Sequence, residues 1–230
     1  MNLKIKFISA ILLINMCIFS SSHAQLPEPK RYIDSSFCVK VKDTLFKKFG
    51  SNKFFIPKFR LQCLIALSYY PSLSDVHIDF TFSNISTTME CRPTPYSVIH
   101  NSLKKEYIIY INNDKNFEGV LLDNVPFNAQ IGVIGHELAH IIDYENQNTI
   151  GIINRGLEYL SVETKKEYEH YIDSLTIRNG LGWQLYDWAD FILNKSAASE
   201  EYKDFKRTTY MIPEQIKSYI FIEEKYKNCR

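Results

Sequence analysis

One stretch of this sequence limits the fold more than any other: residues 128–143, an apolar run that contains His136, Glu137 and His140. Drawn as a helix at about 100° per residue, the run places its large apolar side chains on one stripe, made of Ile131, Ile134, Leu138, Ile141 and Ile142. The two histidines lie close together on the opposite side. A histidine that only fills a core normally shares the apolar stripe, so these two are expected to face a second packed element.

The spacing of the two histidines is that of a metal site. Side chains four residues apart lie on one face of a helix, so His136 and His140 can present two ring nitrogens to one metal ion. Glu137 is turned so that its carboxylate can reach a metal-bound water without ligating the metal. Two incidental histidines on an ordinary helix are the alternative interpretation. Gly132 and Gly135 lower the helix propensity, which indicates close approach by a neighbouring strand.

A later segment, residues 162–180, offers a third ligand. Drawn as a helix, it has a core stripe made of Tyr168, Tyr171, Ile172 and Leu175. Glu169 and Asp173 fall together on one flank of that stripe, where they can face the histidine helix. Glu167 lies on the other flank and His170 points almost directly away from the stripe. Glu169 is therefore the expected third ligand, and Glu167, His170 and Asp173 are the alternatives.

With these residues in place, the sequence resembles the zincin metallopeptidases. Within them it is similar to the gluzincins, in which a later helix supplies a glutamate in an ExxxD pattern, as in "EHYID" at 169–173. The metzincin pattern is excluded because Asp143 and Asn146 stand where that pattern needs a glycine and a histidine. The local sequence looks more like the membrane-bound CAAX-processing peptidases and their soluble relatives. The resemblance covers roughly residues 128–182.

The resemblance implies a Zn²⁺ ion held by His136, His140 and Glu169, with Glu137 as the catalytic base. It also implies that Asp173 accepts a hydrogen bond from one ligating imidazole and fixes its orientation. A further group should donate to the oxyanion that forms during peptide hydrolysis. The sequence leaves this donor open among Tyr168, Tyr171, His170, Arg178 and Tyr210.

The rest of the chain predicts strands followed by helices, an α+β arrangement with a mostly helical C-terminal half. Residues 39–70 are expected to be mainly helical, with breaks near Gly50 and Pro57. The strand candidates that follow are 77–82, 87–93 and 106–114. The resemblance adds a zincin-like fold, in which a small antiparallel or mixed sheet packs on the HExxH active-site helix. In that fold an edge strand, here 87–93 or 107–112, holds the substrate in extended form.

Residues 1–24 have the basic start, apolar run and small-residue exit of a secretion signal, so residues 25–230 are expected to form one exported domain, periplasmic or extracellular. Loss of Lys4 and Lys6 changes the formal charge from +1 to 1 − 2 = −1, and no nucleic acid is expected as a partner. No later stretch suits stable membrane insertion.

An even number of cysteines favours two disulfides, with buried thiols as the alternative. The cysteines are Cys38, Cys63, Cys91 and Cys229.

Two functions remain for such a chain. The first is a secreted zinc-dependent metallopeptidase, a hydrolase in which Glu137 takes a proton from the zinc-activated water that attacks a peptide bond. The second is a non-catalytic secreted binding or envelope protein on a zincin scaffold, with structural zinc. Glu137 separates them, because only the first function needs its carboxylate. The expected partner is a peptide or protein substrate.

Overall fold

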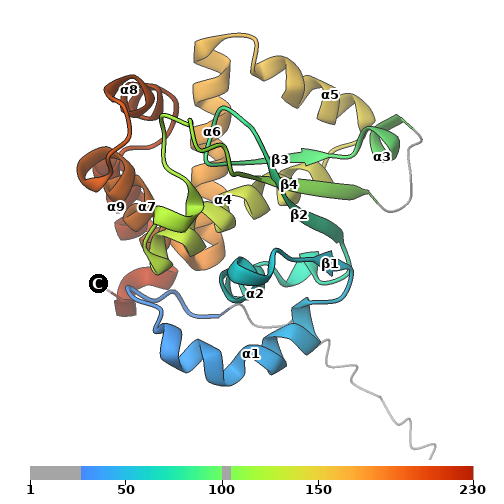
Figure 1. Ribbon diagram of the computed structural model, residues 1–230, viewed down its shortest axis with the longest axis vertical. Coiled ribbons are helices and arrows are strands. Elements are labelled where there is room, and N and C mark those ends of the chain that lie inside the picture. The colour runs from blue at the N-terminus through green and yellow to red at the C-terminus, as the bar shows by residue number, and fades with distance from the viewer. Residues whose placement is uncertain (1–26, 100–104, 230) are drawn as a thin grey trace, which may run out of the picture.

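A mixed sheet and a central helix, α4, organise the fold (Figure 1). The computed structural model describes residues 27–99 and 105–229. Its strands are β1 (Lys53–Phe54), β2 (His77–Ser83), β3 (Met89–Pro93) and β4 (Glu106–Asn112). Its α-helices are α1 (Ser35–Phe49), α2 (Arg60–Ser68), α3 (Pro95–Ile99), α4 (Phe127–Glu145), α5 (Thr149–Glu158), α6 (Val162–Thr176), α7 (Gly182–Asp190), α8 (Glu200–Thr209) and α9 (Pro213–Ile222). The expected signal segment, 1–24, lies outside the described residues.

The described part of the sheet has the strand order β1-β2-β4-β3. β1, β2 and β4 run parallel, and β3 is antiparallel to β4, with Met89 opposite Ile111. The predicted α+β class and small mixed sheet are thus confirmed. β3 is an edge strand and β4 an inner one. Of the two segments proposed as the edge strand beside the histidine helix, 87–93 therefore has the required position and 107–112 does not.

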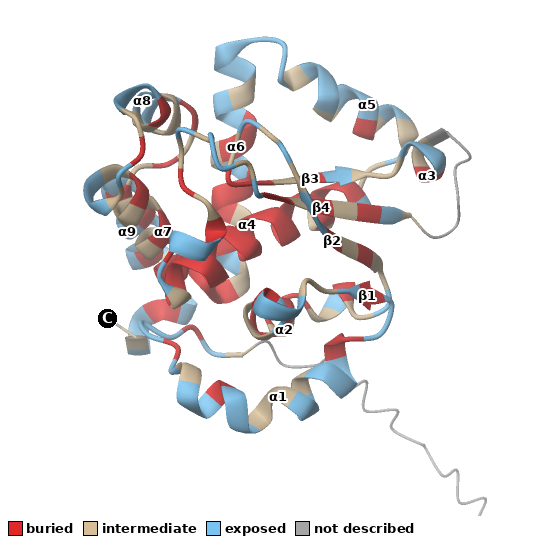
Figure 2. Ribbon diagram, in the orientation of Figure 1, coloured by how far each residue is buried: buried red, intermediate tan, exposed pale blue. Residues whose placement is uncertain are grey.

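α4 is buried on nearly all sides because other elements surround it. It packs against α2, α6, α7 and β3, and Figure 2 shows its buried residues at the centre of the molecule. The predicted apolar stripe is present, since Ile131, Ile134, Leu138 and Ile141 are fully buried and Ile142 packs partly buried against the core. The element that faces its two histidines is α6. The sequence predicted that the histidines face a second packed element and that the helix at 162–180 can face them. It did not predict that α2 and α7 also pack against α4.

Gly132 and Gly135 allow a close backbone approach, but the neighbour is a helix. A Cβ atom on Gly132 would lie 2.1 Å from the carbonyl oxygen of Gln184 in α7. A Cβ atom on Gly135 would lie 2.5 Å from the side chain of Leu181, just before α7. The predicted approach of a strand at this position was therefore wrong. Two helices come together here because glycine leaves room for the partner backbone.

The four cysteines of residues 25–230 are free thiols in the structure, so the expected pair of disulfides is not formed. They lie in separate elements, and Cys38, Cys63 and Cys91 are buried. Burial raises the pKa of the Cys63 and Cys91 thiols. A buried thiol of this kind packs as a small apolar side chain. The alternative of buried free thiols describes three of the four.

The helical prediction for the early chain is confirmed. α1 ends at Phe49 before Gly50, and α2 begins after a short 3-10 turn that starts at Pro57. In the C-terminal half, Trp183 and Trp188 are buried in α7, as amphipathic packing requires. None of the helices in residues 27–99 and 105–229 combines the length and apolar character that crossing a bilayer demands.

Candidate metal centre

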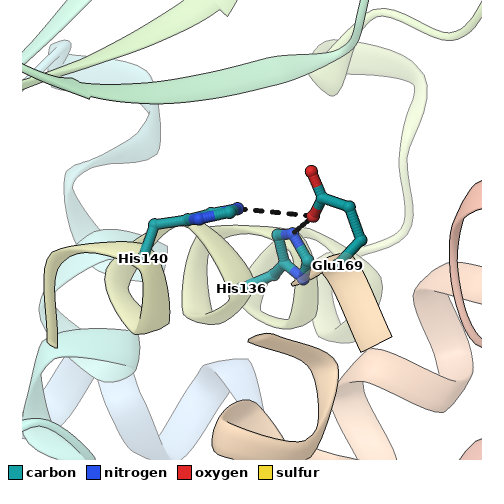
Figure 3. A group of neighbouring side chains, drawn as sticks. All are labelled: His136, His140 and Glu169. Carbon is teal, nitrogen blue, oxygen red and sulfur yellow. Dashed lines mark hydrogen bonds and ion pairs between the residues drawn. The ribbon is translucent and has the colours of Figure 1, made fainter. Parts of the chain in front are cut away.

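Three side chains from two helices converge on a cleft and form a group that could hold a metal ion. His136 and His140 come from α4 and Glu169 from α6, and one ligand atom of each lies within 4.8 Å of the others. Figure 3 shows the carboxylate of Glu169 pointing at both imidazole rings. The structure thus brings together the three residues that the sequence had selected. The alternatives Glu167 and His170 line a separate surface hollow on the other side of α6.

A capping hydrogen bond fixes where α6 begins. Ser161 is the N-cap, and its hydroxyl accepts a hydrogen bond from the backbone N–H of Thr164. Glu169 and Asp173 lie four residues apart further along the helix, so both face α4. They are 2% and 1% exposed, which for carboxylates requires partners. The histidines of α4 are those partners.

Two distances within the group are compatible with a bound metal ion. His136 Nε2 lies 3.1 Å from Glu169 Oε2, and His140 Nε2 lies 3.4 Å from the same oxygen. Ligand atoms bound tetrahedrally at zinc–nitrogen and zinc–oxygen distances of about 2.0–2.1 Å would be separated by roughly 3.3 Å. No fourth histidine, cysteine or carboxylate joins the group among the described residues. One coordination position of a bound ion would therefore stay open.

Asp173 orients the first histidine. Its Oδ1 lies 2.8 Å from His136 Nδ1, and its Oδ2 accepts a hydrogen bond from the backbone N–H of Met211 at 2.9 Å. A proton on Nδ1 of His136 leaves Nε2 with a free lone pair directed at the ligand group. Asp173 thus contacts one imidazole of the group, and it also ties α6 to the segment between α8 and α9.

A second chain of contacts orients the other histidine. His140 Nδ1 lies 3.3 Å from the hydroxyl of Tyr168, which donates to Asp143 Oδ2 at 3.1 Å. Arg155 of α5 holds both oxygens of Asp143, through Nε at 2.7 Å and Nη2 at 2.9 Å. Asp143 and Arg155 were not predicted as site residues from the sequence. The available signal was an acid directly after an apolar helix stripe, since a buried carboxylate requires a partner.

The carboxylates of Asp173 and Glu169 stabilise a positive charge at the two histidines. Burial alone would lower the pKa of His136, but its contacts with Asp173 and Glu169 raise that pKa to about 10. Burial would raise the pKa of Glu169, yet the charges of His140 and His136 hold it well below its usual range. The second carboxylate oxygen of Glu169 accepts a hydrogen bond from Tyr159 at 2.7 Å. A divalent cation can satisfy the same carboxylate once the imidazoles are neutral.

Glu137 lies beside the group but is not part of it. Its side chain lines the cleft, is 5% exposed, and has no hydrogen-bond or ion-pair partner among the described residues. Burial raises the pKa of its carboxyl group, and the nearby His136 and His140 only partly offset this. A desolvated carboxylate with unused acceptors can accept a proton from a molecule that enters the cleft.

The cleft above the group has a volume of about 520 Å³. The edge strand β3 lines it from Met89 to Pro93, and α4, α5 and α6 supply further lining residues. A smaller apolar hollow adjoins it, lined by Leu185, Trp188 and Ile192 among others. The cleft and the hollow share Met89, His136, Glu137 and Tyr210.

The structure separates the five candidate donors for the oxyanion. Tyr168 is engaged behind His140, and Tyr171, His170 and Arg178 line the outer hollow of α6. Tyr210 alone among the five borders the cleft, and its ring centroid lies 5.6 Å from that of His136. Burial raises the pKa of the Tyr210 phenol well above its usual value, so its hydroxyl keeps its proton.

Comparison with known proteins gives no relative from which to transfer a function. No family model, no curated protein and no solved structure matches this chain.

Proposed function

We propose that this protein is a zinc-dependent metallopeptidase. The observation that carries the proposal is the convergence of His136, His140 and Glu169 beside the unpaired carboxylate of Glu137, at the base of a cleft. Two imidazoles and one carboxylate are a usual ligand set for catalytic zinc, whereas structural zinc sites are normally closed by four protein ligands. The three-ligand group among the described residues therefore favours catalysis over a structural ion.

In this proposal zinc, when bound, supplies a water of lowered pKa and polarises the carbonyl of the scissile bond. Glu137 accepts a proton from the attacking water and delivers it to the departing amine. Its raised pKa suits this role, because a more basic carboxylate holds the transferred proton better. Asp173 and Tyr168 keep the two imidazoles oriented throughout.

Tyr210 is the proposed donor to the oxyanion. Its phenol borders the cleft next to His136 and Glu137 and has no hydrogen-bond partner among the described residues. A neutral hydroxyl in this place can donate to the carbonyl oxygen as negative charge develops on it. β3 is the proposed binding edge for the peptide, since its free side can form main-chain hydrogen bonds with an extended chain.

The test is a comparison of zinc-loaded wild type with Glu137→Gln on an unfolded protein and on a peptide library. Wild type should cleave in a chelator-sensitive way, and Glu137→Gln should retain zinc while losing at least about a hundredfold in kcat. Glu167→Gln, an exposed acid on α6, is the matched control and should cleave normally. Absence of chelator-sensitive cleavage by zinc-loaded wild type across the library would refute the proposal. Export remains a prediction from residues 1–24.

A further inference from the structure

Two lysines border the proposed active site without an acidic partner. Lys165 of α6 lines the cleft, and Lys206 of α8 lines the adjoining hollow next to Glu137. Both side chains are half-buried. Neither ammonium group forms a hydrogen bond or an ion pair with any described residue. This is unusual for half-buried lysines, because a charge removed from water normally gains a partner.

Aromatic rings hold the two ammonium groups in place. Lys165 Nζ and Lys206 Nζ lie 4.7 Å and 5.4 Å from the centroid of the same Phe205 ring. Lys165 also lies 5.4 Å from the ring of Tyr159, and Lys206 lies 4.1 Å from the ring of Tyr210. Cation–π contacts of this kind orient a lysine but leave all three of its N–H donors free.

The same rings connect the lysines to the catalytic group. The hydroxyl of Tyr159 donates to Glu169, and the ring of Tyr210 contacts that of His136. Each ammonium group is thus separated from a proposed zinc ligand by a single aromatic side chain. Both lysines therefore lie next to the proposed metal site.

The acids near the cleft do not satisfy these lysines. Glu90 of β3 forms its ion pair with Arg92, and Glu169 belongs to the metal group. Glu137 attracts Lys206 electrostatically but forms no ion pair with it. Burial lowers the pKa of Lys165, which indicates that its ammonium is poorly solvated and would gain from an anionic partner.

We propose that Lys165 and Lys206 bind a carboxylate group of the peptide substrate, and so make this enzyme selective for peptides that present a carboxylate to this part of the cleft. The proposal rests on the peptidase function proposed above. The carboxylate can come from an aspartate or glutamate side chain or from the C-terminus of the peptide. Both sources have the same chemistry, an oxyanion that accepts charge-assisted hydrogen bonds from ammonium groups.

The experiment uses matched peptides on the full-length, zinc-loaded protein. A peptide that wild type cleaves is made in three versions: with glutamate and an amidated C-terminus, with glutamine and an amidated C-terminus, and with glutamine and a free C-terminus. We expect kcat/KM for one acidic version to exceed that for the uncharged version by on the order of tenfold. The version that shows the preference identifies the source of the carboxylate.

Variants assign the preference to the lysines. Lys165→Met with Lys206→Met keeps the unbranched stems and should bring the acid-to-amide ratio close to one. Lys206→Arg should retain the preference, because the positive charge remains. Lys166→Met is the matched control, since Lys166 is exposed and faces the outer hollow, and its ratio should equal that of wild type.

A binding measurement separates the two proposals. Isothermal titration of zinc-loaded Glu137→Gln with the same peptides reports the acid-to-amide ratio of Kd without any hydrolysis. Cleavage or binding with equal preference for all three versions overturns the carboxylate site and leaves the peptidase proposal intact. A preference that persists in the double lysine variant also overturns it. If wild type cleaves no peptide, a lysine-dependent ratio of Kd supports the carboxylate site while the peptidase proposal fails.

Discussion

Asp173→Asn should weaken zinc binding more than Tyr168→Phe, the conservative change behind the other histidine. The carboxylate of Asp173 accepts two hydrogen bonds, one from His136 Nδ1 and one from the backbone N–H of Met211. Asparagine has one acceptor and one donor at these positions. If its oxygen keeps the bond to Met211, its NH₂ group faces His136 Nδ1, and the imidazole proton has to move to Nε2. That proton would occupy the nitrogen proposed to bind the metal.

The size of the effect follows from burial and distance. Asp173 is 1% exposed and its contact with His136 is 2.8 Å, a charge-assisted hydrogen bond with no water to replace it. Loss of such an orienting partner costs up to about 100-fold in metal affinity, or about 2.7 kcal/mol. Tyr168→Phe removes the longer 3.3 Å contact to His140, made by a neutral hydroxyl. It should cost only about tenfold.

The assay is competition for zinc against a chromophoric chelator, with wild type, Asp173→Asn and Tyr168→Phe at the same pH. Circular dichroism and thermal unfolding of the zinc-free proteins show whether the variants are folded. We expect the affinity order wild type, then Tyr168→Phe, then Asp173→Asn. Folded Asp173→Asn with an affinity within about threefold of wild type would refute the tautomer argument. A weaker affinity for Tyr168→Phe than for Asp173→Asn would refute the ranking.

Four further predictions concern other parts of the structure. Arg155→Met should lower the free energy of unfolding by about 3 kcal/mol in chemical denaturation, because Asp143 is 1% exposed and would lose its cation. Gly132→Ala should cost at least about 3 kcal/mol in the same assay, since its methyl group would lie 2.1 Å from a carbonyl of α7. Gly156→Ala has nothing within 4 Å and should stabilise by up to about 1 kcal/mol. Tyr210→Phe should reduce kcat on peptides at least about tenfold with zinc content unchanged, and a normal kcat would remove Tyr210 as oxyanion donor.

The residues that the sequence selected and the structure brings together share a local origin. His136 and His140 are one helical turn apart, and so are Glu169 and Asp173, so the periodicity of each helix places each pair on one face. The sequence could therefore indicate that both pairs are directed at a partner. It could not give their distance, which depends on how α4 and α6 pack.

The residues that the sequence analysis missed depend on contacts between distant segments. Arg155 reaches Asp143 from another helix, and Lys206 lies beside the cleft only because α8 folds back over α6. No periodicity within one helix records such contacts. The incorrect disulfide prediction has a related cause, since an even number of cysteines says nothing about whether their side chains meet.

The distance between the histidines and Glu169 depends on how two helices pack on α4. α7 lies directly against the backbone at Gly132, and α6 presents Glu169 and Asp173 to His136, one turn further along α4. α6 and α7 are joined by the segment Ile177–Leu181, in which Gly180 has φ of 107°, a conformation that other residues rarely adopt. Both consecutive helices contact α4. A larger residue at Gly132 should therefore displace α4 relative to α6 and disturb the metal site, although it touches none of the ligands.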